Sequence, residues 1–164
     1  HNIPFIDTNL KRYQPAAKDL VIGTITMRGG DFYRVSLQPY SKPVRLSQLA
    51  FENATKKNKP NLKPGDVVYA KITSHHRDLE TEIECCDSKT GKAAGFGQLK
   101  EGNIISVGCG FARRLLFQGS PLLEELGSRY VFELAIGVNG KIWVKGQDLR
   151  TTLAVSERIK AADN

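Results

Sequence analysis

The chain has 164 residues, 40% of them hydrophobic, and its 24 Lys and Arg residues outnumber its 17 Asp and Glu residues to give a formal net charge of +7. This length allows one ordinary domain or two small ones, and the charge favours a polyanionic or acidic partner. Three cysteines, with Cys85 and Cys86 adjacent, suggest neither a disulfide framework nor a CxxC zinc site and favour a reducing compartment. No apolar run is long enough to span a bilayer and no signal peptide opens the chain, so no membrane partner is expected.

The first half of the sequence predicts a small β-barrel. The chain opens at His1 rather than Met, so we expect a fragment whose residues 1–17 are a linker. Residues 20–27 and 32–37 alternate apolar and polar side chains, and the intervening Arg28-Gly29-Gly30-Asp31 is typical of a hairpin turn. Further strands are predicted over residues 44–51, 67–73 and 81–87. Five short strands in roughly 70 residues indicate an OB-fold barrel, which we assign to residues 18–90.

A second, mixed α+β unit is predicted over residues 91–164, after a Gly-rich joint at residues 88–102. Strands are predicted at 103–108, 130–137 and 141–146, and helices at 111–117, at 120–127 and from 148 onward. Ser120 is expected to cap the second helix and Gly127 to end it. The apolar residues expected to face the core from the last helix are Leu149, Leu153 and either Val155 or Ile159. The order β-α-α-β-β-α is that of a type I KH domain.

The order of an OB barrel followed by a KH domain resembles the RNA-exosome cap subunits, which pair an S1-type OB domain with a KH domain. Two phrases, residues 49–72 and "GVNGKIWVK" at residues 137–145, resemble one particular member of that family. The resemblance implies a non-catalytic subunit that stabilises a ring of RNase PH-like proteins beside other cap subunits. It also implies single-stranded RNA as a ligand, a part in 3′ to 5′ RNA degradation and rRNA processing, and a location in the nucleus, nucleolus and cytoplasm. In that family a small β domain precedes the barrel, and this chain is expected to lack it.

Candidate RNA-binding residues follow from the strand alternation and from this resemblance. Phe32 and Arg34 share one side of a predicted strand, where a ring could stack a base and a guanidinium could meet a phosphate. Arg45 occupies the place where the family often carries a histidine, and Arg keeps RNA contact possible. The predicted loop before the fourth strand adds Lys56, Lys57 and Lys59. The alternatives are that Phe32 packs under a loop or a missing domain and that the lysines are a solvated charge run.

Gly137-Val138-Asn139-Gly140 has the letters of the G-x-x-G clamp with which KH domains hold a nucleotide backbone. That clamp lies between the first two helices, where this chain carries Gln118-Gly119-Ser120-Pro121 and lacks the second glycine. We therefore interpret residues 137–140 as a two-residue Asn-Gly hairpin turn that packs against the barrel and fixes the two domains together. Trp143, beyond the turn, is interpreted as a packing anchor rather than a stacking platform.

No catalytic constellation is recognised in the sequence. Neither a carboxylate cluster, nor a nucleophile with a base, nor a P-loop or Rossmann glycine pattern occurs, so no catalytic residue, metal ligand or cofactor is assigned. The function expected is that of an exosome cap subunit that guides RNA. Two alternatives stay open: a stand-alone RNA-binding factor in translation or ribosome biogenesis, and a pure scaffold that makes no RNA contact.

Overall fold

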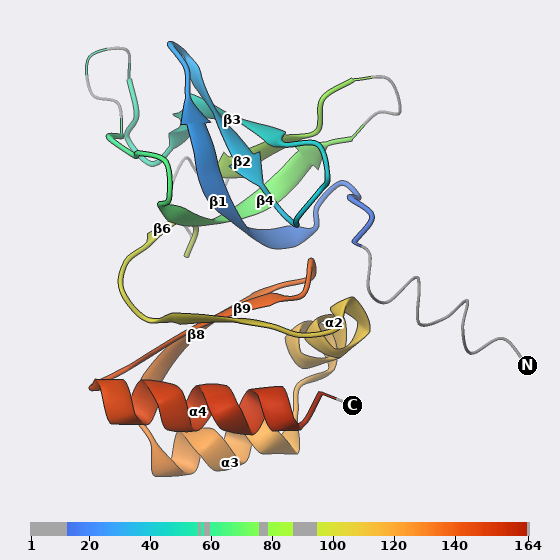
Figure 1. Ribbon diagram of the computed structural model, residues 1–164, viewed down its shortest axis with the longest axis vertical. Coiled ribbons are helices and arrows are strands. Elements are labelled where there is room, and N and C mark those ends of the chain that lie inside the picture. Colours follow the sequence, from blue (N-terminus) through green and yellow to red (C-terminus); the bar gives the residue numbers. More distant parts are fainter. Residues whose placement is uncertain (1–12, 56, 58–59, 76–78, 87–94, 164) are drawn as a thin grey trace, which may run out of the picture. The chain divides into compact units, whose positions relative to one another are not determined.

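The computed structural model describes residues 13–55, 57, 60–75, 79–86 and 95–163. The chain divides into two compact units, one formed by Pro15–Leu99 and the other by the described residues from Lys100 onward together with Tyr13 and Gln14. The first unit is all β, and the second combines three helices with three strands in its described part. Figure 1 shows the labelled helices and strands of both units, coloured along the sequence.

The first unit is a closed barrel with one additional strand. Its strands are β1 (Leu20–Arg28), β2 (Phe32–Ser36), β3 (Val44–Phe51), β4 (Val67–Ser74), β5 (Glu82–Cys85) and β6 (Gly97–Leu99). They hydrogen-bond in the order β1-β2-β3-β5-β4-β6, and pairing of β1 with β4 closes the first five into a barrel. The predicted five-stranded OB-fold is confirmed. The sixth strand lies in the stretch that we expected to be a joint, so the barrel unit runs to Leu99 rather than to residue 90.

The alternation predicted for β2 is present in the barrel core. Tyr33 and Val35 are fully buried, and Leu37 just beyond the strand is buried with them. Strand β1 pairs with both β2 and β4, and Gly23 on β1 is the register partner of Val68 on β4. A Cβ at Gly23 would lie 2.3 Å from Cγ1 of Val35, so a side chain at this position would clash with the core.

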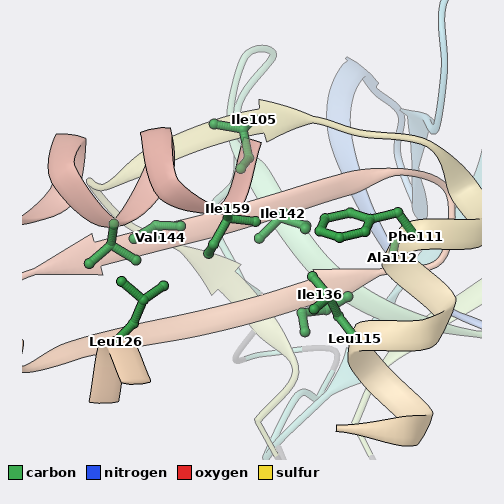
Figure 2. Packing of buried hydrophobic residues seen from close by; sticks show 10 residues of the cluster. Ile105, Phe111, Ala112, Leu115, Leu126, Ile136, Ile142, Val144 and Ile159 are labelled. Atoms are coloured by element: carbon green, nitrogen blue, oxygen red, sulfur yellow. The ribbon is translucent and has the colours of Figure 1, made fainter. Parts of the chain in front are cut away.

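The second unit has the β-α-α-β-β-α order of a KH domain, as predicted. Its elements are β7 (Asn103–Ser106), α2 (Cys109–Gln118), α3 (Pro121–Arg129), β8 (Phe132–Gly137), β9 (Lys141–Gly146) and α4 (Leu149–Ala161). The three strands form an antiparallel sheet in the order β7-β9-β8. Figure 2 shows the buried hydrophobic cluster that joins this sheet to its helices; its labelled members include Ile105, Leu115, Leu126, Ile142 and Ile159.

Helix α3 continues past the residue that we expected to end it. Gly127 lies inside the helix, which extends to Arg129 and is capped by Tyr130, whose N–H donates to the oxygen of Leu126. Leu126 is fully buried, and Arg129 lies 3.6 Å from Glu125 in an i,i+4 ion pair. Burial of Leu126 and this pair hold the last turn in helical conformation, so the glycine is tolerated there.

The buried face of α4 also differs from the prediction. Leu149 is 72% exposed and Leu153 is 44% exposed, so neither side chain contributes to the core. The buried residues of this helix are Thr151, Thr152, Val155, Ser156 and Ile159. Val155 and Ile159, which the prediction gave as alternatives, are both buried, whereas the prediction was wrong for both leucines.

Close packing of α4 on the end of β9 explains why threonines occupy this face. Thr152 Oγ1 accepts a 2.8 Å hydrogen bond from the N–H of Gly146 and donates to the oxygen of Asp148. A Cβ at Gly146 would lie 2.7 Å from Cγ2 of Thr151. Because the helix approaches the strand backbone this closely, short hydroxyl side chains fit where leucines would not.

Candidate nucleic-acid interface

Three of the predicted RNA-binding residues lie together on the outer side of the barrel. Arg34 on β2 is the register partner of Arg45 on β3, and Phe32 is the partner of Ser47. Side chains of paired residues point to the same side of a sheet, and the intervening Tyr33 points into the core. Strand pairing thus brings Phe32, Arg34 and Arg45 onto one surface, which we call the barrel face.

The aromatic ring of the barrel face is flanked by both guanidiniums. The central guanidinium carbon of Arg45 lies 4.2 Å from the centroid of the Phe32 ring, and that of Arg34 lies 5.3 Å from it. Both distances are within the range of cation–π attraction. Stacking of a base on an aromatic or guanidinium plane and neutralisation of its phosphate are both available to this arrangement.

Glu80 is an acidic member of the barrel face that the sequence analysis did not identify. Its carboxylate accepts a hydrogen bond from NH1 of Arg34 in a short ion pair. The two residues are 46 positions apart in the chain, and only the placement of β5 beside β3 brings them together. Neither residue propensity nor the alternation of side chains along a strand predicts contact between residues so far apart in sequence.

Two exposed apolar side chains also belong to the strands of the barrel face. Met27, the register partner of Arg34 on β1, is 50% exposed, and Leu49 on β3 is 47% exposed. Leu49 shares strand parity with Arg45, so alternation alone could have placed it on this side. A register shift precedes Met27 in β1, so alternation along the strand does not predict the side of the sheet on which Met27 lies.

The predicted lysine loop is only partly described. Lys57 is exposed, whereas Lys56 and Lys59 lie outside the described residues. The described end of the loop is fastened to the barrel by Tyr33, whose hydroxyl donates to the oxygen of Pro60 at 2.8 Å and accepts from the N–H of Leu62 at 3.2 Å. The strand residue that follows Phe32 therefore fixes where the loop returns to the barrel.

The β1–β2 turn beside Phe32 is held by a buried glutamine. Gln48, 2% exposed on β3, donates from Nε2 to the oxygen of Gly29 and from its backbone N–H to the oxygen of Asp31, each at 3.0 Å. The N–H of Gly29 in turn donates to the oxygen of Phe32 at 2.8 Å. These bonds satisfy the buried amide and fix the backbone that carries the ring.

The position of the KH clamp holds a helix start. Ser120 accepts a 3.1 Å hydrogen bond on Oγ from the N–H of Leu122 and caps α3, with Pro121 as the first helical residue. Gly119 adopts a positive φ of 70° in the short loop that precedes this cap. With one glycine, and with the serine oxygen occupied by the helix, this loop lacks the usual G-x-x-G arrangement.

The phrase at residues 137–140 forms the β8–β9 turn, as predicted, but not with two residues. Residues 138–140 separate the register pair Gly137 and Lys141, and only Gly140 has a positive φ, of 85°. The N–H of Gly140 donates to the oxygen of Gly137 at 3.0 Å. The turn is a three-residue hairpin loop, in which the last residue rather than the Asn-Gly pair takes the left-handed conformation.

Side chains in and beyond this turn are buried. Val138 is fully buried, and Asn139 and Trp143 are 6% and 8% exposed. Nε1 of Trp143 donates to the backbone oxygen of Glu101 at 2.8 Å. A buried ring whose polar atom is satisfied by the backbone of its own unit favours a packing role for Trp143.

Two of the described thiols, Cys85 and Cys109, are poorly suited to nucleophilic chemistry. Burial raises the pKa of the Cys85 thiol far above its usual range, and it also raises the pKa of the Cys109 thiol. Thiols of this kind are poor nucleophiles. Within the described ranges, no group of three or more His, Cys, Asp or Glu side chains is arranged to hold a metal ion, and His75 instead contacts Thr81 Oγ1 at 2.7 Å.

None of the described helices combines the length and apolar character that a bilayer span needs.

Comparison with known proteins decides the family. A family model described as the S1 domain of exosome complex component RRP40 matches residues 13–97, just over half of the chain. The chain belongs to the RRP40 family. A KH-domain model matches residues 102–150. The resemblance of residues 49–72 and 137–145 to ribosomal RNA-processing protein 40 is thereby confirmed.

Relatives in three organisms bear the same name. The chain is 53% identical to exosome complex component RRP40 of Saccharomyces cerevisiae over 151 residues, which are 92% of this chain and 63% of that protein. It is 43% identical to rrp40 of Schizosaccharomyces pombe over 160 residues, 97% of this chain and 66% of that protein. It is 37% identical to RRP40 of Homo sapiens over 161 residues, 98% of this chain and 58% of that protein. The chain thus spans roughly three fifths of the length of these RRP40 proteins.

A solved structure shares the fold. A crystal structure whose description names an exosome complex RNA-binding protein matches with a TM-score of 0.67 over 92% of this chain and 87% of that one. At 21% identity this likeness shows the fold alone.

Proposed function

We propose that this chain acts as a non-catalytic cap subunit of the RNA exosome that guides single-stranded RNA through contacts made by the barrel face. The observation that carries the proposal is the Phe32 ring with Arg45 and Arg34 at 4.2 and 5.3 Å from its centroid. Membership of the RRP40 family supports the exosome assignment, since the relatives are named as components of that complex.

The mechanism is electrostatic attraction followed by stacking. A net charge of +7 draws a polyanion towards the chain, and Arg45, Arg34 and the lysines at 56, 57 and 59 neutralise phosphates. Phe32 stacks a base without reading its edge, so binding depends on salt and has little sequence preference. These are the properties that a guide for passing RNA requires.

The KH unit serves mainly as a protein-docking surface in this proposal. The serine-capped loop in place of the clamp supports this assignment, because it leaves no glycine-rich backbone to approach a phosphate. Its partners would be RNase PH-like ring subunits and other cap subunits, in a complex of the nucleus, nucleolus and cytoplasm that degrades and processes RNA, including rRNA, from 3′ to 5′. The buried turn at residues 137–140 is proposed to fix the two domains together.

The same loop favours a second candidate function, a scaffold without RNA contact. The two functions differ in what mutation of the barrel face does. Binding of a fluorescent single-stranded RNA, followed by anisotropy, should weaken on Arg45→Gln and be insensitive to Arg150→Gln, a matched loss of charge at an exposed position on α4. Absence of RNA binding by the wild type would favour the scaffold, and equal effects of the two substitutions would argue that the RNA contact lies outside the barrel face.

Docking is tested by recovering partners from extract with this chain after RNase treatment. Recovery of RNase PH-like ring proteins supports the cap assignment. Recovery of ribosomal or translation proteins in their place would favour a stand-alone RNA-binding factor.

A further inference from the structure

We propose that Glu80 is an intramolecular competitor for phosphate, which occupies Arg34 in the free protein and must be displaced when RNA binds. This inference rests on the proposed RNA contact of the barrel face. It adds a residue that sets the affinity of that contact and assigns the two arginines different roles.

The ion pair spans a strand of the barrel. Arg34 lies on β2, Glu80 immediately precedes β5, and β3 lies between these two strands in the sheet order. Arg45 on β3 is the register partner of Arg34 on one side and of Glu82 on the other. The Glu80 carboxylate therefore reaches Arg34 across the strand that carries Arg45, on the side where RNA is proposed to bind.

The pair is accessible and exchangeable. The side chains of Arg34 and Glu80 retain 30% and 42% of their exposure. Ion pairs at such positions contribute little net stability, because water and salt screen them. A phosphate can consequently replace the carboxylate at the guanidinium without first opening a buried structure.

Carboxylate and phosphodiester oxygens compete for the same donors. A guanidinium binds both through charged N–H···O bonds of similar geometry, so Glu80 holds Arg34 as a backbone phosphate would. Arg45 forms no ion pair within the described part of the chain, and its guanidinium lies over the Phe32 ring. Arg45 is therefore the cation open to the first phosphate, and Arg34 becomes available only by exchange.

This arrangement lowers affinity without altering the stacking platform. Each phosphate bound at Arg34 costs one intramolecular pair, so the net gain is small and the strand is released readily. A face that RNA must pass, rather than occupy permanently, benefits from this weak second contact.

Replacement of the carboxylate tests the inference. Glu80→Gln keeps the shape of the side chain and removes its charge, and Glu82→Gln is the matched control, since Glu82 is exposed, lies next in the register row and forms no ion pair among the described residues. Binding of a fluorescent oligouridine is measured against salt for the wild type, both single variants, and Arg34→Gln with and without Glu80→Gln. We expect Glu80→Gln to tighten binding about two- to fivefold beyond Glu82→Gln, from the usual worth of an exposed pair.

The salt dependence supplies a second readout. In the wild type the carboxylate displaced from Arg34 takes up cations again, so fewer cations are released on binding than in Glu80→Gln, whose slope of log affinity against log salt should be steeper by up to about 0.7 for a single strand. Both effects should disappear when Arg34 is replaced by Gln. A general change in net charge would alter the salt slope whether or not Arg34 is present. A difference in slope between the wild type and Glu80→Gln that requires Arg34 therefore points to exchange at this guanidinium.

The outcomes separate the inference from the proposed function. If the wild type binds oligouridine and Glu80→Gln matches Glu82→Gln, the competitor role is wrong and the RNA site stands. If Glu80→Gln weakens binding, Glu80 positions Arg34 instead of blocking it, and the inference is again wrong. If neither the wild type nor Glu80→Gln binds, both the inference and the RNA role of the barrel face are overturned.

Discussion

The guanidinium of Arg45 lies 4.2 Å from the centroid of the Phe32 ring, between neighbouring strands of the barrel. Neither residue is paired with a carboxylate among the described residues, so this stack is the part of the barrel face that is open to a ligand. An arginine at this place can serve a nucleic-acid contact because its guanidinium is flat, can stack on a ring and can donate hydrogen bonds to a phosphate.

Removal of the ring should weaken RNA binding without unfolding the barrel. Base–aromatic stacking contributes about 1–3 kcal/mol, so Phe32→Ala should raise the dissociation constant for single-stranded RNA by roughly 5- to 150-fold. Phe32→Tyr should retain most of the affinity. Phe117→Ala is the control, since Phe117 is 65% exposed on α2. Equal affinities for the Phe32→Ala and Phe117→Ala variants would contradict the assignment.

The hydroxyl of Tyr33 should stabilise the barrel by fastening the lysine loop. Tyr33→Phe leaves the oxygen of Pro60 and the N–H of Leu62 without their partner, at a cost of about 1–3 kcal/mol in the free energy of unfolding. Urea unfolding followed by fluorescence measures this change, and hydrogen exchange at Leu62 should accelerate. Tyr40 is fully exposed, so Tyr40→Phe should change neither quantity.

Gly140 should tolerate no side chain. Its φ of 85° disfavours any other residue, and a Cβ would lie 2.5 Å from the oxygen of Val107. Gly140→Ala is expected to lower the free energy of unfolding of the KH unit by about 1–3 kcal/mol, from backbone strain of this kind. Gly127→Ala is the opposite case, because its Cβ would meet open space inside α3 and should stabilise by about 0.5–1 kcal/mol. Similar melting of both variants would argue against this account of the turn.

The cap of α4 should stabilise the KH unit in a pH-dependent way. The Thr151 N–H donates to Asp148 Oδ1 at 2.7 Å and lowers the pKa of that carboxyl below its ordinary value of 3.8. A lowered folded-state pKa means that the ionised cap stabilises the fold above the unfolded pKa, and that this contribution is lost as the pH falls through the folded value. The melting temperature of the wild type should therefore exceed that of Asp148→Ala at pH 7, and the difference should shrink below pH 3.8. Asp148→Ser retains an uncharged cap, so its melting temperature should differ from that of Asp148→Ala by an amount that does not change with pH. A pH-dependent difference between these two variants would exclude the Asp148 carboxylate as the source of the effect.

Much of the fold was predictable because local signals agreed with the topology. Alternation in β2 and β3 placed Tyr33 inside the barrel and Phe32 outside it, and Ser120 with Pro121 marked the start of α3. The element order of a type I KH domain was predicted from apolar residues that change from strand-like to helix-like spacing after the barrel. These signals involve neighbours in sequence, which propensity and capping describe well.

The errors arose where tertiary contacts outweighed such signals. Gly127 carries a local stop signal, yet the buried Leu126 keeps its turn helical. Leu149 and Leu153 are apolar, yet the close approach of Gly146 selects threonines for the inner face of α4. Long-range partners of this kind are set by the fold as a whole.

The barrel face was predictable only in part for the same reason. The alternation of side chains along β2 and the resemblance to cap subunits predicted Phe32, Arg34 and Arg45 as site residues. The carboxylate of Glu80 enters from beyond β3, and a shift of register hides Met27. No pattern within a single strand reports either contact.

Photocrosslinking tests the central claim most directly. A single-stranded RNA that carries 5-iodouridine would be bound to the intact chain, irradiated, and the crosslinked peptide mapped by mass spectrometry. The account predicts that the main crosslink falls on Phe32, and that excess unlabelled RNA and high salt both suppress it. Crosslinks confined to the KH unit, or no crosslink under conditions in which RNA binds, would contradict the proposal that the barrel face guides RNA.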